Sequence, residues 1–199
     1  MFVFRLTTKK SLIQIQIVSQ IGGVKMETRR LILRPYKQED LEDYWEYISN
    51  PNVVEYEPYK PMSLSEAKES LQERIANTEF IAVEEKDSHR MIGNVYLGKR
   101  EFNTLEIGYV FNEHYWKKGY AKEACSALIE KAFEDGIHRI YAECDPDNPN
   151  SWRLLEKLGF VREAHLKENV YFWTDENDRP IWKDTLIYSL LGEKNASKK

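Results

Sequence analysis

The chain has 199 residues, of which 42% are hydrophobic, 13% aromatic and 31% charged, a composition typical of a globular protein of one domain that buries a sizeable core. Its 29 Lys and Arg residues against 33 Asp and Glu residues give a net charge of -4, which argues against generic binding to nucleic acid or to an anionic membrane. Residues 1–25 contribute four positive charges and no acidic residue, so residues 26–199 carry -8 of the total.

Cysteine and histidine usage excludes two further classes of protein. Cys125 and Cys144 are too few for a disulfide scaffold and have no CxxC spacing, so we expect a reducing, cytoplasmic setting. The four histidines form no HxH or HxxxH pair, and we therefore expect no metal site. No apolar run approaches the roughly 18 residues of a membrane span, so we expect no membrane partner.

The first 25 residues differ from the rest of the chain. Residues 12–18 alternate as a short strand, which lacks the cleavage site of a secretory signal, and Gly22 and Gly23 end the pattern before Met26. We expect residues 1–25 to be an extension outside the domain, produced by a mis-set start codon; a targeting peptide is the alternative. The domain is then residues 26–191, followed by a tail at 192–199.

Two amphipathic helices follow a strand predicted at residues 30–34. An apolar stripe with spacing i, i+3, i+4, i+7 predicts a helix that begins at Gln38 and ends before Asn50-Pro51. The members of this stripe are Leu41, Tyr44, Trp45 and Ile48. Ser63 and Glu66 have the spacing of a capping box, which predicts a second helix from Ser63.

Three strands in succession predict an antiparallel meander, at residues 80–83, 91–97 and 105–111. The strongest helical stripe of the chain then runs over 121–133, and Gly136 closes it. The remaining predicted elements are a strand at 137–144, a loop at 145–150, a short helix ended by Gly159 and a hairpin of residues 170–173 and 181–188. His138, Tyr171 and Asp184 lie in or beside these strands and are expected to be structural.

The segment 110–121, VFNEHYWKKGYA, joins a strand to a helix through a loop that suits a phosphate. Gly119 lets backbone N–H groups approach a ligand, the helix N-terminus supplies unpaired donors, and Lys117 and Lys118 add positive charge. The loop is neither a Walker A loop nor GxGxxG. The alternative is a helix-entry turn with a solvated lysine pair.

A second motif, NPNSWRLLEKLGF at residues 148–160, follows one strand and one loop later. Together, WKKGYA and NxxSxxLLEKLGF resemble the acyl-CoA-binding core of the GNAT N-acetyltransferases, in the branch of the ribosomal-protein N-terminal acetyltransferases. The resemblance covers about residues 26–191, with TRRLILRPY, IGxVYL and WKDTLIYSLL in their expected order. It implies an α/β (α+β) GNAT fold with a mixed, mostly antiparallel sheet and helices on both faces.

The resemblance assigns residues to acetyl-CoA by position. The pyrophosphate loop corresponds to Trp116, Lys117, Lys118, Gly119, Tyr120 and Ala121, with Trp116 where Arg or Gln is usual. Val110 and Phe111 would offer backbone groups to the pantetheine arm, and Asn148 and Ser151 would lie near the thioester. Many members have a tyrosine seven residues after that Asn; here the position is Leu155, which excludes a tyrosine acid at this site.

Two residues are candidates for proton transfer. Glu106, on the strand that faces the cleft in this family, is the expected base, acting directly or through water; a solvated or salt-bridged strand residue is the alternative. Ser151 could donate to the leaving thiolate, and a helix N-cap is its alternative role. A backbone N–H near Val110 could stabilise the oxyanion.

The acceptor is expected to be a cationic primary amine. Acidic and aromatic side chains that suit such a substrate cluster around the end of the first helix: Trp45, Glu55, Tyr56 and Glu57. For Trp45 a core role is the alternative. We expect acetyl transfer to the N-terminal α-amine of a protein by a cytoplasmic monomer or homodimer that binds no nucleic acid. The alternatives are an enzyme for a polyamine, aminoglycoside or amino acid analogue, and a non-catalytic CoA-binding regulatory module.

Overall fold

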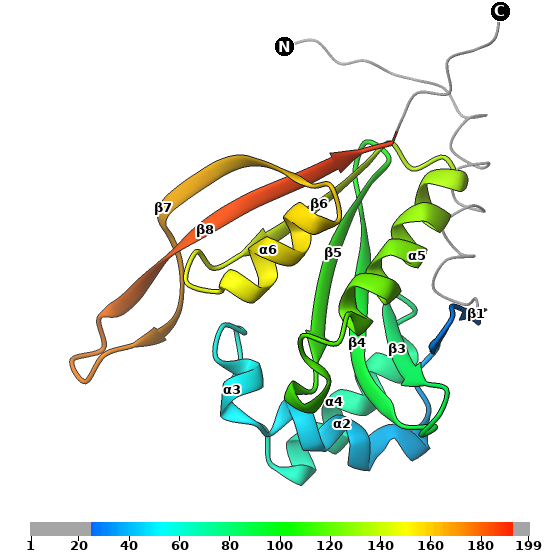
Figure 1. Cartoon of the computed structure of the whole chain (residues 1–199). Helices are drawn as coiled ribbons and strands as arrows, with labels where there is room; N and C mark the ends of the chain where they lie inside the picture. Colours follow the sequence, from blue (N-terminus) through cyan, green and yellow to red (C-terminus); the bar gives the residue numbers. More distant parts are fainter. Residues whose placement is uncertain (1–24, 193–199) are drawn as a thin grey trace, which may run out of the picture.

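One mixed sheet runs through the part of the chain that the computed structural model describes, residues 25–192 (Figure 1). Its eight strands are ordered β1-β2-β3-β4-β5-β6-β8-β7, and every neighbouring pair is antiparallel except β5 and β6. The strands are β1 (Met26–Glu27), β2 (Leu31–Arg34), β3 (Phe80–Glu85), β4 (Met91–Arg100), β5 (Thr104–Phe111), β6 (Arg139–Cys144), β7 (Val161–Thr174) and β8 (Pro180–Leu191). The predicted mixed, mostly antiparallel sheet is confirmed.

Helices cover both faces of this sheet, as expected. They are α2 (Leu41–Ile48), α3 (Pro51–Val54), α4 (Leu64–Ala76), α5 (Tyr120–Glu134) and α6 (Pro149–Lys157), with short 3-10 helices η1 (Gln38–Asp40) and η2 (Glu113–Tyr115). Leu128 of α5 and Leu155 of α6 belong to one buried apolar cluster, whereas Tyr44 of α2 and Leu71 of α4 belong to a second. None of the helices described is long and apolar enough to cross a membrane.

Local hydrogen bonds explain where the first helices begin. Ser63 and Glu66 form the predicted capping box at the start of α4. The sequence Asn50-Pro51, predicted to end a helix, also begins one: the Asn50 side chain accepts a hydrogen bond from the Asn52 N–H, and Pro51 is the first residue of α3. The predicted strand at 12–18 lies outside the described residues.

Trp45 was predicted to lie in the apolar stripe of α2, and this prediction is wrong. Trp45 is 39% exposed, and its indole N–H donates to the Met62 carbonyl at 3.2 Å. The buried face of α2 consists instead of Tyr44, Tyr47 and Ile48. Tyr47 is tied down because its hydroxyl donates to Asn94 of β4 at 2.9 Å, a partner that helical spacing cannot predict.

The β7–β8 hairpin is much longer than the predicted strands and extends away from the rest of the molecule (Figure 1). Its register shifts three times, between Arg162 and Ala164, between Leu166 and Val170, and between Tyr171 and Thr174. Such irregularities break the alternation by which a strand is identified, which is why the first half of β7 gave no signal.

The two parallel strands pair over only three residues. Thr104, Leu105 and Glu106 of β5 are opposite residues 139–141 of β6, and no further pair follows. Beyond this point β6 stays paired with β8 as far as Cys144, while β5 stays paired with β4 as far as Phe111. The two strands therefore diverge, and the candidate site lies on the elements around this divergence.

Candidate active site

The loop before α5 has the backbone shape of an anion site. Lys117 and Gly119 both have left-handed φ angles, 58° and 83°. Gly119 is the N-cap of α5 and supplies no side chain to cap it, so the N–H groups of the first turn, from Tyr120 and Ala121 onward, have no side-chain acceptor. A helix N-terminus of this kind favours a phosphate.

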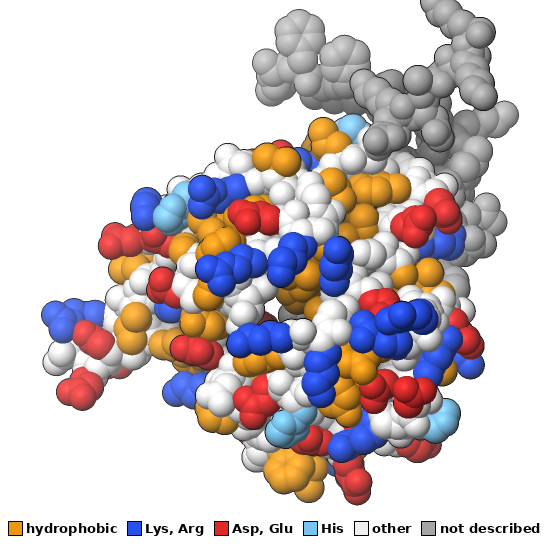
Figure 2. All heavy atoms as spheres, in the orientation of Figure 1, with side chains coloured by type: hydrophobic (Ala, Val, Ile, Leu, Met, Phe, Trp, Pro, Cys, Tyr) orange, Lys and Arg blue, Asp and Glu red, His pale blue; other side chains and the backbone are white. Residues whose placement is uncertain are grey.

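Positive side chains surround the N-termini of α5 and α6. Figure 2 shows Lys and Arg side chains around a hollow in the middle of the face that presents these helices. Exposed cations near the two first turns are Lys117, Lys118, Lys122 and Arg153. On a domain whose net charge is negative, this concentration of cations suits an anionic ligand.

Arg30, directly before β2, contacts the same loop. Its guanidinium donates to the Lys118 carbonyl at 3.0 Å and forms a 2.7 Å ion pair with Glu123 of α5. It also lies 4.2 Å from the centre of the Tyr120 ring. These contacts hold the loop against the sheet and leave Lys117 and Lys118 exposed.

Trp116 has a structural contact that the sequence did not predict. Its indole N–H donates to the Phe111 carbonyl at 2.7 Å, so the residue ties the loop to the end of β5. The Phe111 side chain is buried in the core. The Phe111 carbonyl, expected to serve the pantetheine arm, therefore already accepts one hydrogen bond, which leaves one further lone pair.

The backbone of Val110 points to β4. The Asn112 N–H donates to the Ile92 carbonyl at 2.9 Å. In an antiparallel ladder, every second pair of opposite residues is hydrogen-bonded. Asn112 and Ile92 form such a pair, so Val110 and Asn94, two positions along the ladder, form the next one. The ladder thus uses the groups expected to face the cofactor.

The residues between these pairs face the other way. Tyr109 and Phe111 direct their backbone groups away from β4, toward the side where β6 has no pairing beyond Glu106. The N–H groups of Tyr109 and Phe111, the neighbours of Val110, are therefore the backbone donors that point toward the divergence.

The entrance of α6 brings the second motif to the same place. Asn148 is the N-cap of α6, and its side chain accepts a hydrogen bond from the Ser151 N–H at 3.1 Å. Ser151 is thus the third helical residue, not the N-cap, which leaves its hydroxyl free of the capping role. That hydroxyl lies 3.2 Å from the Tyr109 hydroxyl. Leu155 is fully buried in the core.

Glu106 lies on the opposite face of the sheet from α5 and α6. Its neighbours Leu105 and Ile107 are in the core under α5, and successive side chains of a strand alternate between faces. One carboxylate oxygen accepts hydrogen bonds from Arg100 and, at 3.0 Å, from Tyr141. No described residue donates to the other oxygen, which can therefore accept a proton or a water molecule.

The loop after α3 lies beside the turn that precedes α6. The Lys183 ammonium is 2.9 Å from Asp145 and 6.0 Å from the centre of the Tyr56 ring. Burial and the negative charges of Glu55, Asp145 and Asp147 raise the pKa of Tyr56. The sequence did not single out Asp145, Asp147 or Lys183, because their position here depends on folding.

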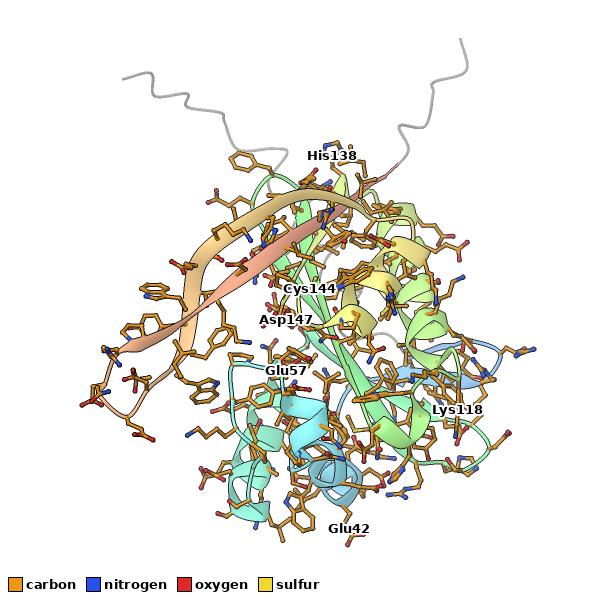
Figure 3. All side chains as sticks on the ribbon, turned by 60° about the vertical axis from the view of Figure 1, so that its left-hand side comes forward. Glu42, Glu57, Lys118, His138, Cys144 and Asp147 are labelled. Carbon is orange, nitrogen blue, oxygen red and sulfur yellow. The ribbon has the colours of Figure 1, made fainter. Side chains whose placement is uncertain are left out.

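Glu57 is the most perturbed carboxyl group of this loop. Burial raises its pKa to about 7, and the nearby Tyr59 hydroxyl and the charge of Arg74 offset part of the effect. Figure 3 shows Glu57 and Asp147 on neighbouring elements near the middle of the molecule. The Trp45 side chain is exposed, and its indole N–H donates to the Met62 carbonyl rather than to this group.

Between residues 25 and 192, no group of three or more His, Cys, Asp or Glu side chains could hold a metal ion. The site described so far contains backbone donors, lysines, hydroxyls and carboxylates.

The arrangement agrees with comparisons with known proteins. The sequence profile of the acetyltransferase (GNAT) domain matches residues 30–161. The N-acetyltransferase YnaD of Bacillus subtilis, itself uncharacterised, is 34% identical over 172 residues, which cover 83% of this chain and 96% of YnaD. The spermidine N(1)-acetyltransferase of Vibrio cholerae is 28% identical over 149 residues, 71% of this chain and 85% of that protein.

Solved structures have the same fold. A GNAT-family acetyltransferase from Bacillus anthracis superposes with a TM-score of 0.78 at 29% identity, over 86% of this chain and 100% of that one. The ribosomal-protein-S5-alanine acetyltransferase of Vibrio fischeri gives 0.70 at 23% identity, over 86% and 98%. Spermidine N-acetyltransferase of Vibrio cholerae, in complex with CoA and spermine, gives 0.68 at 24%, over 84% and 98%. The last two likenesses show the fold alone.

Proposed function

We propose that this chain, which belongs to the GNAT family of acetyltransferases, acetylates the N-terminal α-amine of a protein, as ribosomal-protein acetyltransferases do. The protein is an acetyl-CoA-dependent N-acetyltransferase. Its acceptor, and the residues that act on it, are the subject of the proposal.

The residues around the divergence of β5 and β6 fit the cofactor. When bound, acetyl-CoA supplies the acetyl group as an activated thioester. The first turn of α5, with Gly119, Lys117 and Lys118, would hold the pyrophosphate. Asn148 shapes the entrance of α6 and Ser151 presents its hydroxyl there, so this end of the site would hold the thioester.

The surroundings of Glu106 carry the proposal for the acceptor. A carboxylate is a weak base, and Glu106 is held in place by its contacts with Arg100 and Tyr141. An α-amine with a pKa of roughly 7.7–8.0 needs only about 1–1.4 kcal/mol to lose its proton at pH 7, whereas an alkyl amine such as lysine, with a pKa of about 10.4, needs roughly 4.6 kcal/mol. A weak base such as the Glu106 carboxylate therefore suits an N-terminal amine better than an alkyl amine.

The residues of this chain then have separate tasks. The free oxygen of Glu106 accepts the proton of the amine, directly or through water. The N–H groups of Tyr109 and Phe111 stabilise negative charge on the acetyl oxygen. Ser151 donates a hydrogen bond to the departing sulfur. Glu55, Glu57, Asp145 and Asp147 attract the cationic acceptor.

A thiol-release assay tests the acceptor. Acetyl-CoA is offered with a lysine-free peptide that has a free Ala or Ser N-terminus, with an N-terminally blocked peptide that contains lysine, with spermidine and with an aminoglycoside. We expect turnover with the first peptide and little with the blocked one. Turnover confined to the small amines would overturn the proposal.

Acetylation of a polyamine is the second candidate. It is supported by the 28% identity to a spermidine acetyltransferase and by the acidic side chains beside the loop after α3. An alkyl amine holds its proton more tightly than an α-amine. If spermidine is the preferred acceptor, we therefore expect the rate of its acetylation to rise steeply between pH 7 and pH 9.

A further inference from the structure

Tyr109 lies where β5 and β6 diverge, three residues after the last pair between them. Its ring is partly buried against the cluster that contains Leu155 and residues of α5. Burial, with a smaller contribution from Cys125, raises the pKa of Tyr109 well above that of a free phenol. The hydroxyl of Tyr109 is therefore protonated at neutral pH.

This hydroxyl makes two contacts with the same residue. It donates to the Ser151 carbonyl at 3.0 Å, and it lies 3.2 Å from the Ser151 hydroxyl oxygen. A phenol has one proton, which the carbonyl takes, so in the second contact Ser151 is the donor and Tyr109 the acceptor. Tyr109 thus holds both the main chain and the side chain of Ser151.

The contacts connect two elements, β5 and α6. Tyr109 comes from β5 and Ser151 from the first turn of α6, 42 residues further along the chain. One turn after Ser151, α6 presents the buried and apolar Leu155 to the core. Because α6 has Leu155 where many family members have a tyrosine, the phenol that contacts Ser151 comes from Tyr109 of β5.

We propose that Tyr109 is a positioning residue, which holds the Ser151 hydroxyl where it can turn its proton from the phenol oxygen to the sulfur of CoA. A hydrogen bond to a negatively charged sulfur is stronger than one to a neutral phenol, so the serine proton turns when charge develops on the sulfur. No proton is transferred from serine in this step. The inference rests on the role proposed above for Ser151.

Binding measurements without an acceptor test this inference. Dissociation constants of CoA and of desulfo-CoA, which lacks the sulfur, are compared at a pH of about 9.5, where a thiol with a pKa of about 8.5 is mostly thiolate. We expect the unmodified protein to prefer CoA by about tenfold. Tyr109→Phe and Ser151→Ala should both remove this preference while binding desulfo-CoA as before.

Tyr188→Phe is the matched control. Tyr188 is 1% exposed, and its hydroxyl donates to Glu156 of α6 at 3.1 Å, so this variant also removes one phenol hydroxyl that anchors the same helix. It should keep the preference for CoA. A loss of the preference in Tyr188→Phe as well would overturn the proposal, because any loosening of α6 would then suffice.

Turnover gives a second readout, with whichever acceptor of the panel is acetylated fastest. Tyr109→Phe should lower kcat by about tenfold, with the KM for acetyl-CoA within about twofold, and should cause no further loss when combined with Ser151→Ala. Losses that multiply in the double variant, or a CoA preference that survives in Tyr109→Phe, would overturn the inference. A panel result in favour of small amines would reject the proposed acceptor and leave this inference standing.

Discussion

Gly119 is the residue on which the phosphate site depends most directly. Its left-handed φ suits glycine, and a Cβ there would approach only the Arg30 side chain, at 3.5 Å. We expect Gly119→Ala to lower the free energy of unfolding by about 1 kcal/mol through backbone strain. Gly119→Glu places a carboxylate in the anion site and should abolish CoA binding, as measured by calorimetry.

Gly136→Ala separates strain from ligand binding. Gly136 lies just beyond the other end of α5, has a φ of 85° and has no neighbour within 4 Å of an added Cβ. The substitution should cost a similar amount of stability and leave the dissociation constant of CoA unchanged. CoA binding by Gly119→Glu at the affinity of the unmodified protein would reject the phosphate site.

Glu106→Gln tests the proposed base. It keeps the size of the side chain but removes the proton acceptor, so we expect kcat to fall by about 100-fold with little change in CoA binding. Glu101→Gln, at an exposed position of the preceding turn, should have no effect on either quantity. An undiminished kcat in Glu106→Gln would assign the proton transfer to another group, with Glu57 the first to examine.

The surroundings of single residues were only partly predictable. The pattern around Gly119 and Asn148 identified a loop and a helix entrance because the residues involved are contiguous. The partners of Glu106 carried no such signal: Tyr141 is 35 residues away in the sequence, and Arg100 is brought back by a turn. Only the register between β4, β5 and β6 places them together.

Among the elements, β2 is held by an ion-pair network of Arg34. The guanidinium bonds both oxygens of Asp40, at 2.7 and 2.8 Å, and one oxygen of Glu84 in β3, at 2.6 Å. All three side chains are at most 11% exposed. We expect Arg34→Ala to lower the free energy of unfolding by about 3–5 kcal/mol, because two buried carboxylates lose their partner. Urea denaturation measures the change.

Arg179→Ala is the corresponding control, since its ion pair with Asp175 is exposed and joins residues of one turn. It should cost less than about 1 kcal/mol. The pKa of Glu84 is held below its usual value by Arg34, Lys37 and His89, although burial acts in the opposite direction. The stability that ionised Glu84 contributes is therefore present at neutral pH and lost as the solution becomes acidic.

Equal losses of unfolding free energy in Arg34→Ala and Arg179→Ala would contradict the prediction.

Element boundaries followed the sequence where local signals were strong. The helix predicted at 121–133 is α5, Tyr120–Glu134, because its stripe is long and Gly136 follows it. The helix α3 was missed, since Asn50-Pro51 indicates the end of one helix as well as the start of another. The first half of β7 was missed because its bulges remove the alternation that identifies a strand.

For the whole molecule, we predict that deletion of residues 1–25 preserves the domain. The first described strand, β1, begins at Met26, and the family profile begins at residue 30. Met26 itself packs against the core and is kept. The truncated protein should bind CoA as the full chain does and unfold at a similar temperature in a thermal melt. A large loss of CoA affinity would return this segment to the domain.

The sequence by itself determined most of the helices and strands and the loop that suits a phosphate, through periodicity, capping and turn geometry among residues that are neighbours in the chain. The family and its mixed sheet came from the resemblance of two short motifs, whose residues are also contiguous. Only the tertiary structure decided that β5 and β6 diverge after three pairs, that Tyr109 reaches Ser151, and that Arg100 and Tyr141 anchor Glu106. These contacts join residues distant in sequence, and their energy exists only once the sheet has closed.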